Sequence, residues 1–328
     1  MSNHFTFVNS LTRREWLRRA GVLSGSAGLV GAWPEWAFAF RGQPAAPADQ
    51  IAAMRAQLGA APITAAELAP NLTLLSGPGG NVVVSRGADG KVIVDTFVQP
   101  AWTNLKAALD KMGNEKIATV IDTHWHFDHA DNNGAFRKAG AAIVAHDNTK
   151  KRMSEAHELM GSKIPPSPAD ALPTQTFAVT RRIDANGEQI MLGKIPPAHT
   201  DTDIYIKFQK ANVLHLGDVF FNGMYPFIDG TTGGSINGMI DGVTFSMKQA
   251  DKTTKIIPGH GPLGDLAALT QFRDMLVTAR DRVAKLKKSG QTLEQVVAAT
   301  PTKDLDAVWG KGFFPPNAFV GLVYSTLP

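Results

Sequence analysis

Cysteine is absent from the 328 residues of this chain. Its absence excludes disulfides, thiolate metal sites and a cysteine nucleophile, so any metal must be bound by histidine and carboxylate side chains. Net charge is also low, because 33 lysines and arginines against 29 aspartates and glutamates give only +4. No basic run reaches the density of a nucleic-acid-binding surface, so we expect no nucleic-acid partner.

Long hydrophobic runs are missing at the N-terminus as well. The mildly apolar stretch at residues 20–33 is Gly- and Ser-rich and about 14 residues long, whereas a membrane span needs about 20. We therefore expect no stable membrane span. Hydrophobic residues nevertheless make up 44% of the chain, which permits a sizeable core and excludes a disordered or collagen-like protein.

The N-terminus has the features of a twin-arginine export signal. Arg13 and Arg14 precede the uncharged stretch, and Ala37-Phe38-Ala39 offers a small-x-small cleavage site. An amphipathic first helix with surface arginines is the alternative. Removal of residues 1–39, with four basic and two acidic residues, leaves 29 basic against 27 acidic residues and a net charge of +2. We expect the twin-arginine export machinery to carry the folded protein to the periplasm or beyond.

The rest of the chain divides into a lead-in and one domain. Residues 40–70 are rich in Ala, Pro and Gln and predict a lead-in with one short helix near residues 51–58. Residues 71–328 predict a single α/β domain, because β-branched runs alternate with stretches of helical periodicity. Four prolines predict a loop at 162–173. Strands are predicted at 72–75, 81–85, 91–95, 117–122, 142–145, 175–179, 189–192, 203–208, 213–216 and 255–257. Helices are predicted at 102–112, 133–138, 148–160, 236–248, 266–287 and 293–299.

Three histidines and an aspartate lie within six residues, directly after a predicted strand. They are His124, His126, Asp128 and His129. An extended or tightly turning backbone directs His124 and His126 to the same side. Four donors are too many for one tetrahedral metal with an open position, but they divide naturally between two. Histidine nitrogen and carboxylate oxygen are ordinary zinc ligands.

Three further candidate ligands are isolated in the sequence. His199 and His260 lie in Pro- or Gly-containing loops, and Asp218 follows the strand predicted at 213–216. Each follows an apolar run and precedes a turn, so all three are expected at the rim of one sheet edge. Taken alone, each also fits an ordinary loop or turn residue.

The other histidines with a predicted role are interpreted as non-ligands. His215 lies inside a predicted strand and is assigned to the core or a sheet face. His146 is also interpreted as a non-ligand, and His157 is placed on the exposed face of the helix predicted at 148–160.

The pattern His-x-His-x-Asp-His, followed by isolated His, Asp and His, resembles the metallo-β-lactamase superfamily. The resemblance covers about residues 71–262 and implies a four-layer αβ/βα sandwich with metals between the sheet edges. It implies that one zinc ion is bound by His124, His126 and His199. It implies that a second is bound by Asp128, His129 and His260, with Asp218 bridging the two. Residues 130–134 read Ala-Asp-Asn-Asn-Gly, where many relatives have small-Gly-Gly; this departure removes no ligand.

The resemblance also implies hydrolysis by a hydroxide held between two Zn²⁺ ions, although His and carboxylate sites accept other first-row divalent metals. Asp128 is predicted to be catalytic, because it can orient the nucleophile by a hydrogen bond while binding metal. Thr123, Thr200 and Asp203 are candidates to hold the imidazoles in place, with capping or turn roles as the alternative.

The substrate is expected to be a small molecule, and the fold alone does not choose it. An aspartate at the position of Asp218 is the pattern of thioesterases, lactonases and phosphodiesterases in this superfamily, whereas β-lactamases of the largest subclass have cysteine there. Those β-lactamases have a lysine three residues later, where this chain has Phe221. We therefore expect an exported hydrolase of an ester, lactone or amide, with a β-lactamase-like enzyme as the alternative.

Two alternatives come from other classes. A diiron redox enzyme usually carries a flavin domain, but only helical patterns without a Gly-rich phosphate loop follow residue 262. A non-catalytic metal-binding protein is disfavoured because all seven ligand positions are occupied. The apolar residues expected to line the mouth of the site are Trp125, Phe127, Phe220, Phe221, Met224, Tyr225, Phe227 and those at 313–314. Ordinary core packing is the alternative for all of them except Trp125 and Phe127. Asn222 and Asn237 are candidate oxyanion donors. The sequence predicts no oligomeric state.

Overall fold

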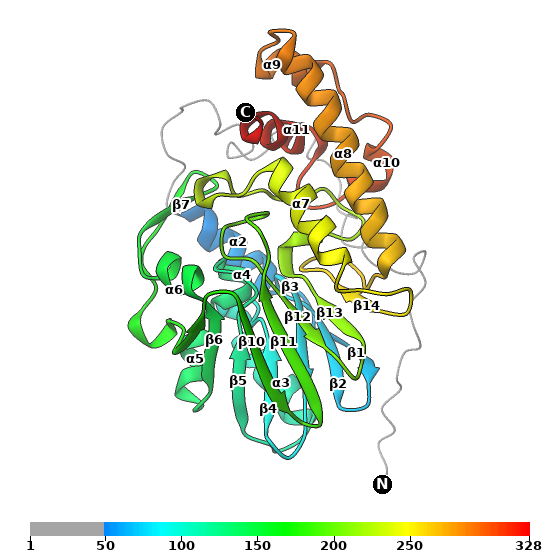
Figure 1. Ribbon diagram of the computed structural model, residues 1–328. Coiled ribbons are helices and arrows are strands. Elements are labelled where there is room, and N and C mark those ends of the chain that lie inside the picture. Colours follow the sequence, from blue (N-terminus) through cyan, green and yellow to red (C-terminus); the bar gives the residue numbers. More distant parts are fainter. Residues whose placement is uncertain (1–48) are drawn as a thin grey trace.

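Two β-sheets face each other at the centre of the molecule, and helices cover the outer face of each (Figure 1). The computed structural model describes residues 49–328, so the export signal predicted at 1–39 lies outside the described residues. Alternating side chains explain the layers, because neighbours along a strand point to opposite faces. Val83 and Val92 pack between the sheets, whereas Val82, Val84 and Ile93 pack toward the helices.

The first sheet has seven strands in the order β1-β2-β3-β4-β5-β6-β9. They are β1 (Thr64–Ala69), β2 (Leu72–Gly77), β3 (Gly80–Ser85), β4 (Lys91–Val94), β5 (Ile117–Ile121), β6 (Ala142–His146) and β9 (Gln175–Phe177). β1 to β4 pair antiparallel, and β4, β5, β6 and β9 pair parallel. The helices of this half are α2 (Asp49–Gly59), α3 (Trp102–Lys111), α4 (Phe127–Ala130), α5 (Asn133–Lys138) and α6 (Asp147–Met153).

The second sheet has five strands in the order β10-β11-β12-β13-β14. They are β10 (Thr180–Ala185), β11 (Glu188–Lys194), β12 (Ile204–Phe208), β13 (Val213–His215) and β14 (Lys255–Ile257). β14 pairs parallel with β13, while the other pairs are antiparallel. Five helices follow in this half: α7 (Ile236–Met247), α8 (Leu266–Lys288), α9 (Leu293–Ala298), α10 (Asp306–Trp309) and α11 (Pro316–Thr326). In the part of the chain that the structure describes, no helix is both long and apolar enough to cross a membrane.

The predicted α/β sandwich is confirmed, and one predicted helix is wrong at its C-terminal end. The helix expected at 148–160 stops at Met153, and a hairpin of β7 (His157–Leu159) and β8 (Ser162–Ile164) follows. The turn explains the difference: Met160 and Gly161 have φ of 50° and 76°, and two consecutive positive φ values form the tight turn that suits a two-residue hairpin. His157 therefore lies on a strand rather than on a helix.

Other differences lie at segment boundaries. The loop predicted at 162–173 includes β8 and a short 3₁₀ helix, Ala169–Ala171. The strand predicted at 175–179 ends at Phe177, and β10 begins in the other sheet three residues later. Within the residues predicted as a lead-in, β1 pairs with β2 and Ile51 of α2 is buried. The packed structure therefore begins before residue 71.

Candidate metal centre

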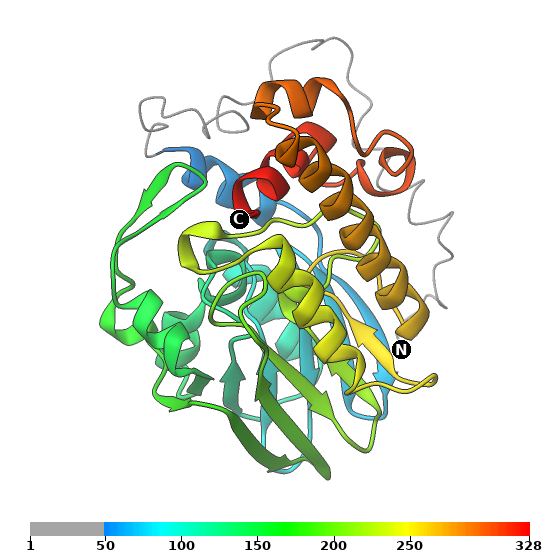
Figure 2. The same cartoon turned by 45° about the horizontal axis from the view of Figure 1, so that its top comes forward.

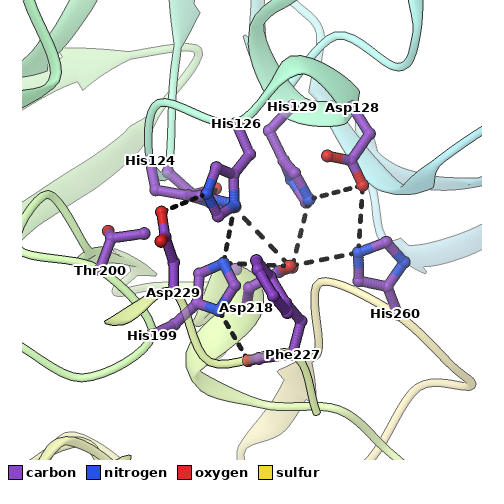
Figure 3. A network of polar contacts seen from close by, with 12 residues as sticks. His124, His126, Asp128, His129, His199, Thr200, Asp218, Phe227, Asp229 and His260 are labelled. Atoms are coloured by element: carbon purple, nitrogen blue, oxygen red, sulfur yellow. Dashed lines mark hydrogen bonds and ion pairs between the residues drawn. The ribbon is translucent and has the colours of Figure 1, made fainter. Parts of the chain in front are cut away.

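The seven predicted ligands converge at the edge where the two sheets meet (Figure 3). The string from residue 124 to 129 follows β5 and runs into α4. The other ligands follow strands of the second sheet: His199 lies between β11 and β12, Asp218 follows β13, and His260 follows β14. The fold therefore joins one local cluster with three residues from distant parts of the chain. The distances between their ligand atoms divide them into two groups. The first group is His124, His126, His199 and Asp218, and the second is Asp128, His129 and His260.

The first group combines three imidazole nitrogens with the carboxylate of Asp218. His126 Nδ1 lies 3.1 Å from His124 Nε2 and 2.9 Å from His199 Nε2. Asp218 Oδ2 lies 3.5 Å from His199 Nε2 and 3.9 Å from His124 Nε2. All four residues are buried.

The second group is more open and shares Asp218 with the first. Asp128 Oδ2 lies 3.3 Å from His260 Nε2 and 3.5 Å from His129 Nε2. Asp218 Oδ1 lies 3.2 Å from His129 Nε2, and its Oδ2 lies 3.3 Å from His260 Nε2. Asp218 thus reaches both groups, as the resemblance implies for a bridging residue.

The outward-facing nitrogens are held by fixed acceptors. His126 Nε2 lies 3.1 Å from Asp229 Oδ2, and His129 Nδ1 lies 2.7 Å from Asp95 Oδ2. His199 Nδ1 lies 2.9 Å from the carbonyl oxygen of Phe227. Since carboxylate and carbonyl oxygens only accept, these contacts put the ring protons on the outer nitrogens. In the neutral form of each ring, the inner nitrogen therefore keeps the lone pair that metal binding requires.

This arrangement fits metal ions. Lone pairs on nitrogen atoms 2.9 to 3.1 Å apart repel one another, and a cation between them removes that cost. Two buried atoms, His129 Nε2 and Asp218 Oδ1, make no hydrogen bond at all, although buried polar atoms are almost always paired. Histidine nitrogens and carboxylate oxygens are also an ordinary zinc ligand set.

The charges of the protein prepare the site for cations. Burial lowers the pKa of His199 to about 4, which keeps that imidazole neutral. Burial alone would raise the pKa of Asp128 and Asp218, but the adjacent imidazoles outweigh it and hold both well below the usual range. Burial lowers the pKa of His260, but attraction to Asp218 and Asp128 prevails and raises it to about 9. Both carboxylates are therefore ionised at neutral pH, and a metal ion bound by His260 would replace the proton that this imidazole otherwise carries.

The residues predicted to hold the imidazoles have different roles. Thr123 Oγ1 lies 3.1 Å from His124 Nδ1 and donates to Asp95 Oδ2, so it connects a ligand to a buried carboxylate. Asp203 instead accepts from the backbone N–H groups of His199 and Thr200, at 2.8 and 2.9 Å. It shapes the loop rather than touching an imidazole ring.

Two supporting carboxylates were assigned no role from the sequence. Asp95 directly follows β4, has a φ of 64°, and accepts from His129 and from the backbone N–H of Thr123. The only feature of the sequence that could have marked Asp95 is a polar residue directly after a buried apolar strand. Asp229 lies in the loop after Asp218, 103 residues from the histidine it holds, and nothing local in the sequence marks it.

Among the residues that the structure describes, the other three histidines lie outside both groups. His215 is buried, accepts from the N–H of Gly217 and lies 3.3 Å from the Asn81 carbonyl oxygen. His146 caps α6, accepting from the N–H of Asn148, and donates to the Ala178 carbonyl. The ring of His157 lies 5.0 Å from that of Trp125.

An aromatic wall borders the centre. The Phe221 ring stacks on His260 at 5.1 Å, and Phe227 lies 5.8 Å from the rings of both His126 and His199. Phe314 stacks on Phe227 at 5.2 Å, so the segment before α11 supports this wall. The candidate oxyanion donors have other partners: Asn222 donates to the Pro262 carbonyl, and Asn237 accepts from Arg280.

The loop that carries Phe227 and Asp229 is fastened to the C-terminal helices. The N–H of Tyr225 donates to the Trp309 carbonyl at 2.8 Å, and the Tyr225 ring stacks on Phe319 at 4.3 Å. Elements at the end of the chain thereby fix the position of groups that touch His126 and His199.

Comparison with known proteins gives a consistent result. A family model described as the metallo-beta-lactamase superfamily matches residues 76–260, which include all seven candidate ligands. An uncharacterized protein of Mycobacterium tuberculosis is 25% identical over 207 residues, covering 60% of this chain and 91% of that protein. A probable metallo-hydrolase of Methanocaldococcus jannaschii is 25% identical over 187 residues, covering 55% of this chain and 86% of its own.

Solved structures show the same fold. A metallo-beta-lactamase from Pontibacter korlensis is 16% identical, with a TM-score of 0.56, covering 66% of this chain and 99% of that one. The DIM-1 metallo-beta-lactamase is 19% identical, with a TM-score of 0.55, covering 66% of this chain and 98% of its own.

Proposed function

The chain belongs to the metallo-beta-lactamase superfamily and is a metal-dependent hydrolase, and we propose that it binds two zinc ions and cleaves an ester, lactone or amide bond. The observation that carries this proposal is the pair of ligand groups joined by Asp218, which lies within 3.5 Å of His129, His199 and His260. One group alone would suit a single metal. A carboxylate that reaches both groups supports two.

His124, His126 and His199 would hold one zinc ion, and Asp128, His129 and His260 the other, with Asp218 shared. When bound, the zinc ions supply Lewis acidity and lower the pKa of water from about 15.7 toward about 7, which provides a nucleophile near neutral pH. The outer contacts of His126, His129 and His199 orient their inner nitrogens toward the metals.

Substrate is expected to approach from the side of the second group. The side chains of His260 and Asp128 are 23% and 14% exposed, whereas His124 and His199 are fully buried. Asp128 is ionised and faces this opening, so its carboxylate can accept a hydrogen bond from the attacking water and orient it toward a carbonyl carbon. We therefore assign Asp128 a catalytic role in addition to its role as a ligand.

The neighbours of this opening favour an uncharged substrate. Phe221 stacks flat on His260, at the position where the resemblance places a carboxylate-binding lysine in many β-lactamases. An aromatic ring gives no ionic partner to an anionic drug. We accordingly rank an uncharged ester, lactone or amide above a β-lactam carboxylate.

We also propose that the protein acts in the periplasm or outside the cell after export by the twin-arginine pathway. This proposal rests on Arg13, Arg14 and the cleavage site at residues 37–39. Replacement of both arginines by lysine should leave an unprocessed protein in the cytoplasm. Normal processing of that variant would contradict the export proposal without bearing on the chemistry.

The deciding experiment combines metal analysis with a turnover panel of an acyl lactone, a p-nitrophenyl ester, a phosphodiester and a chromogenic cephalosporin. We expect about two zinc ions per chain and preferred turnover of the lactone or ester. His126→Ala should abolish that turnover while the circular dichroism spectrum is retained. His146→Asn is the control, because asparagine preserves the helix cap. Preferred cephalosporin turnover, iron in place of zinc, or full activity of His126→Ala would each refute the proposal.

A further inference from the structure

A pocket of about 90 Å³ lies next to the metal centre and contains none of its ligands. Trp125 and Phe127, which flank His126 in the sequence, form part of its wall. The Trp125 ring lies 4.8 Å from the His126 ring. A group bound in the pocket would therefore be separated from a metal ligand by a single aromatic side chain.

The remaining walls come from segments that the ligand pattern does not include. α2 contributes Arg55, the end of α6 contributes Met153, and the β7–β8 hairpin contributes Leu159 and Ile164. The 3₁₀ helix at 169–171 contributes Ala171. Both ribbon views place the hairpin beside α2 (Figures 1 and 2). α2 lies before the region that the family model matches, which begins at residue 76.

The two arginines of the pocket are already paired. Arg55 donates two hydrogen bonds to Asp131, at 2.7 and 2.9 Å. Arg152 donates two to Asp201, at 2.7 and 3.1 Å. Glu155 adds a further negative charge to the lining. An anionic group would have to compete with carboxylates already bound in bidentate geometry, so the charge pattern favours an uncharged ligand.

Most of the other lining is apolar, and its size limits what can enter. Leu159 is buried to 2% exposure and Trp125 to 5%, and Phe127 lies under the Arg55 guanidinium at 4.7 Å. A volume of about 90 Å³ is smaller than the roughly 150 Å³ of an engineered apolar cavity that binds benzene. It therefore suits a group of a few carbon atoms.

We propose that this pocket binds a compact, uncharged, apolar group of the substrate, such as the short or branched acyl chain of an ester or lactone. The inference rests on the proposed hydrolase function, whose substrate it narrows. Each methylene group buried in such a pocket should strengthen transition-state binding about fourfold, until the pocket is full. Chain-length preference should therefore rise over a few carbons and then stop.

Filling the pocket tests this directly. Ala171→Leu and, as a second variant, Ser167→Leu add side-chain volume to two lining positions. Ala298→Leu, on an exposed face of α9, is the control.

We would measure kcat/KM for p-nitrophenyl esters from acetyl to octanoyl, including isobutyryl. Wild type and control should gain about fourfold per methylene up to the optimum. The filled variants should lose at least tenfold on the optimal ester and less than threefold on the acetyl ester. Unchanged chain-length profiles in both folded variants would overturn the inference.

A binding measurement separates this inference from the proposed function. Isobutanol contains a compact apolar group and no scissile bond, and its contact with the intact protein can be followed by saturation-transfer NMR. Signal in wild type and Ala298→Leu, with loss in Ala171→Leu and Ser167→Leu, supports the pocket even if no ester is hydrolysed. Ester hydrolysis that His126→Ala abolishes, together with equal isobutanol signals in all four proteins, would sink the pocket and leave the hydrolase function intact.

Discussion

Asp229→Asn should weaken the metal centre without unfolding the protein. Asp229 is 1% exposed and accepts from His126 Nε2 at 3.1 Å. It also accepts from the N–H and hydroxyl of Thr231 and from the hydroxyl of Thr232. Asparagine has nearly the same shape, and its carbonyl oxygen in the place of Oδ1 can keep both contacts to Thr231. Its NH₂ group then takes the place of Oδ2, which in the wild type accepts from Thr232 and from His126. The NH₂ group therefore presents donors to a nitrogen that must itself donate.

The expected magnitude follows from the role of such contacts. Loss of a hydrogen bond that orients a ligating histidine typically costs about 10- to 100-fold in metal affinity or activity, equivalent to about 1.4–2.8 kcal/mol. In the Asp229→Asn variant, a side-chain amide that donates to Nε2 would favour the ring proton on Nδ1, the nitrogen that faces His124 and His199. We expect a loss in the upper half of that range, because the substitution changes the tautomer of His126 and also removes the negative charge beside its ring.

Asp251 provides a matched control. It also accepts from the N–H and hydroxyl of a threonine two residues later, Thr253. It is exposed, however, and it contacts Asn212, at the opposite end of β13 from Asp218. Zinc affinity by chelator competition, kcat/KM and thermal midpoint should be measured for Asp229→Asn and Asp251→Asn. The reasoning is refuted if Asp229→Asn binds zinc and turns over substrate within threefold of wild type, or if Asp251→Asn shows the same loss.

Three other changes test separate parts of the structure. Gly259→Ala should lower activity at least 100-fold and reduce the zinc content, because a Cβ there would lie 1.9 Å from Asp218 Oδ1. The control is Gly321→Ala, whose Cβ would meet no atom within 4 Å apart from its chain neighbours and the backbone of its own helix, and which should leave both quantities unchanged. Normal zinc content in Gly259→Ala would refute the close approach. Phe314→Ala should lower the free energy of unfolding by about 3–5 kcal/mol in urea titrations, since the ring is buried against Phe227, and a change below 1 kcal/mol would show that the C-terminal segment does not support the wall. Burial lowers the pKa of His146 below its ordinary value, so the unfolded chain takes up this proton first and the histidine costs stability as the pH falls from about 6.5 through the folded pKa. The stability of wild type relative to His146→Asn should therefore decline between pH 7.5 and 5.5, and a constant or rising difference would contradict that sign.

The metal ligands were predictable because four of the seven are local in sequence. A strand that runs into His124 and His126 fixes their relative direction with no knowledge of the rest of the fold. The three isolated ligands needed the added expectation that strand ends meet at one edge. Asp229 could not be found in this way. Its contact with His126 depends on how a loop of the second half packs against α4, and an Asp-Gly pair in a loop is an ordinary turn signal.

The missed secondary structure has a similar explanation. Four of the six residues of β1 are exposed, so its sequence shows no alternation of apolar and polar residues. Only its backbone pairing with β2 marks it as a strand. The β7–β8 hairpin was hidden by residues that also fit a continued helix. Its turn at residues 160–161 is specified by backbone conformation, whereas hydrophobic periodicity reports only which side chains are buried.

The metal ligands lie in one part of the chain, whereas the walls beside them also depend on the segments that flank it. All seven ligands lie within residues 76–260, the region that the family model matches. The pocket beside Trp125 needs Arg55 of α2, which precedes that region, and the wall at Phe227 needs Phe314, which follows it. A substitution in either flanking segment should consequently change which substrate is accepted while leaving zinc content unaltered. A substitution among the ligands should reduce turnover of every substrate in proportion.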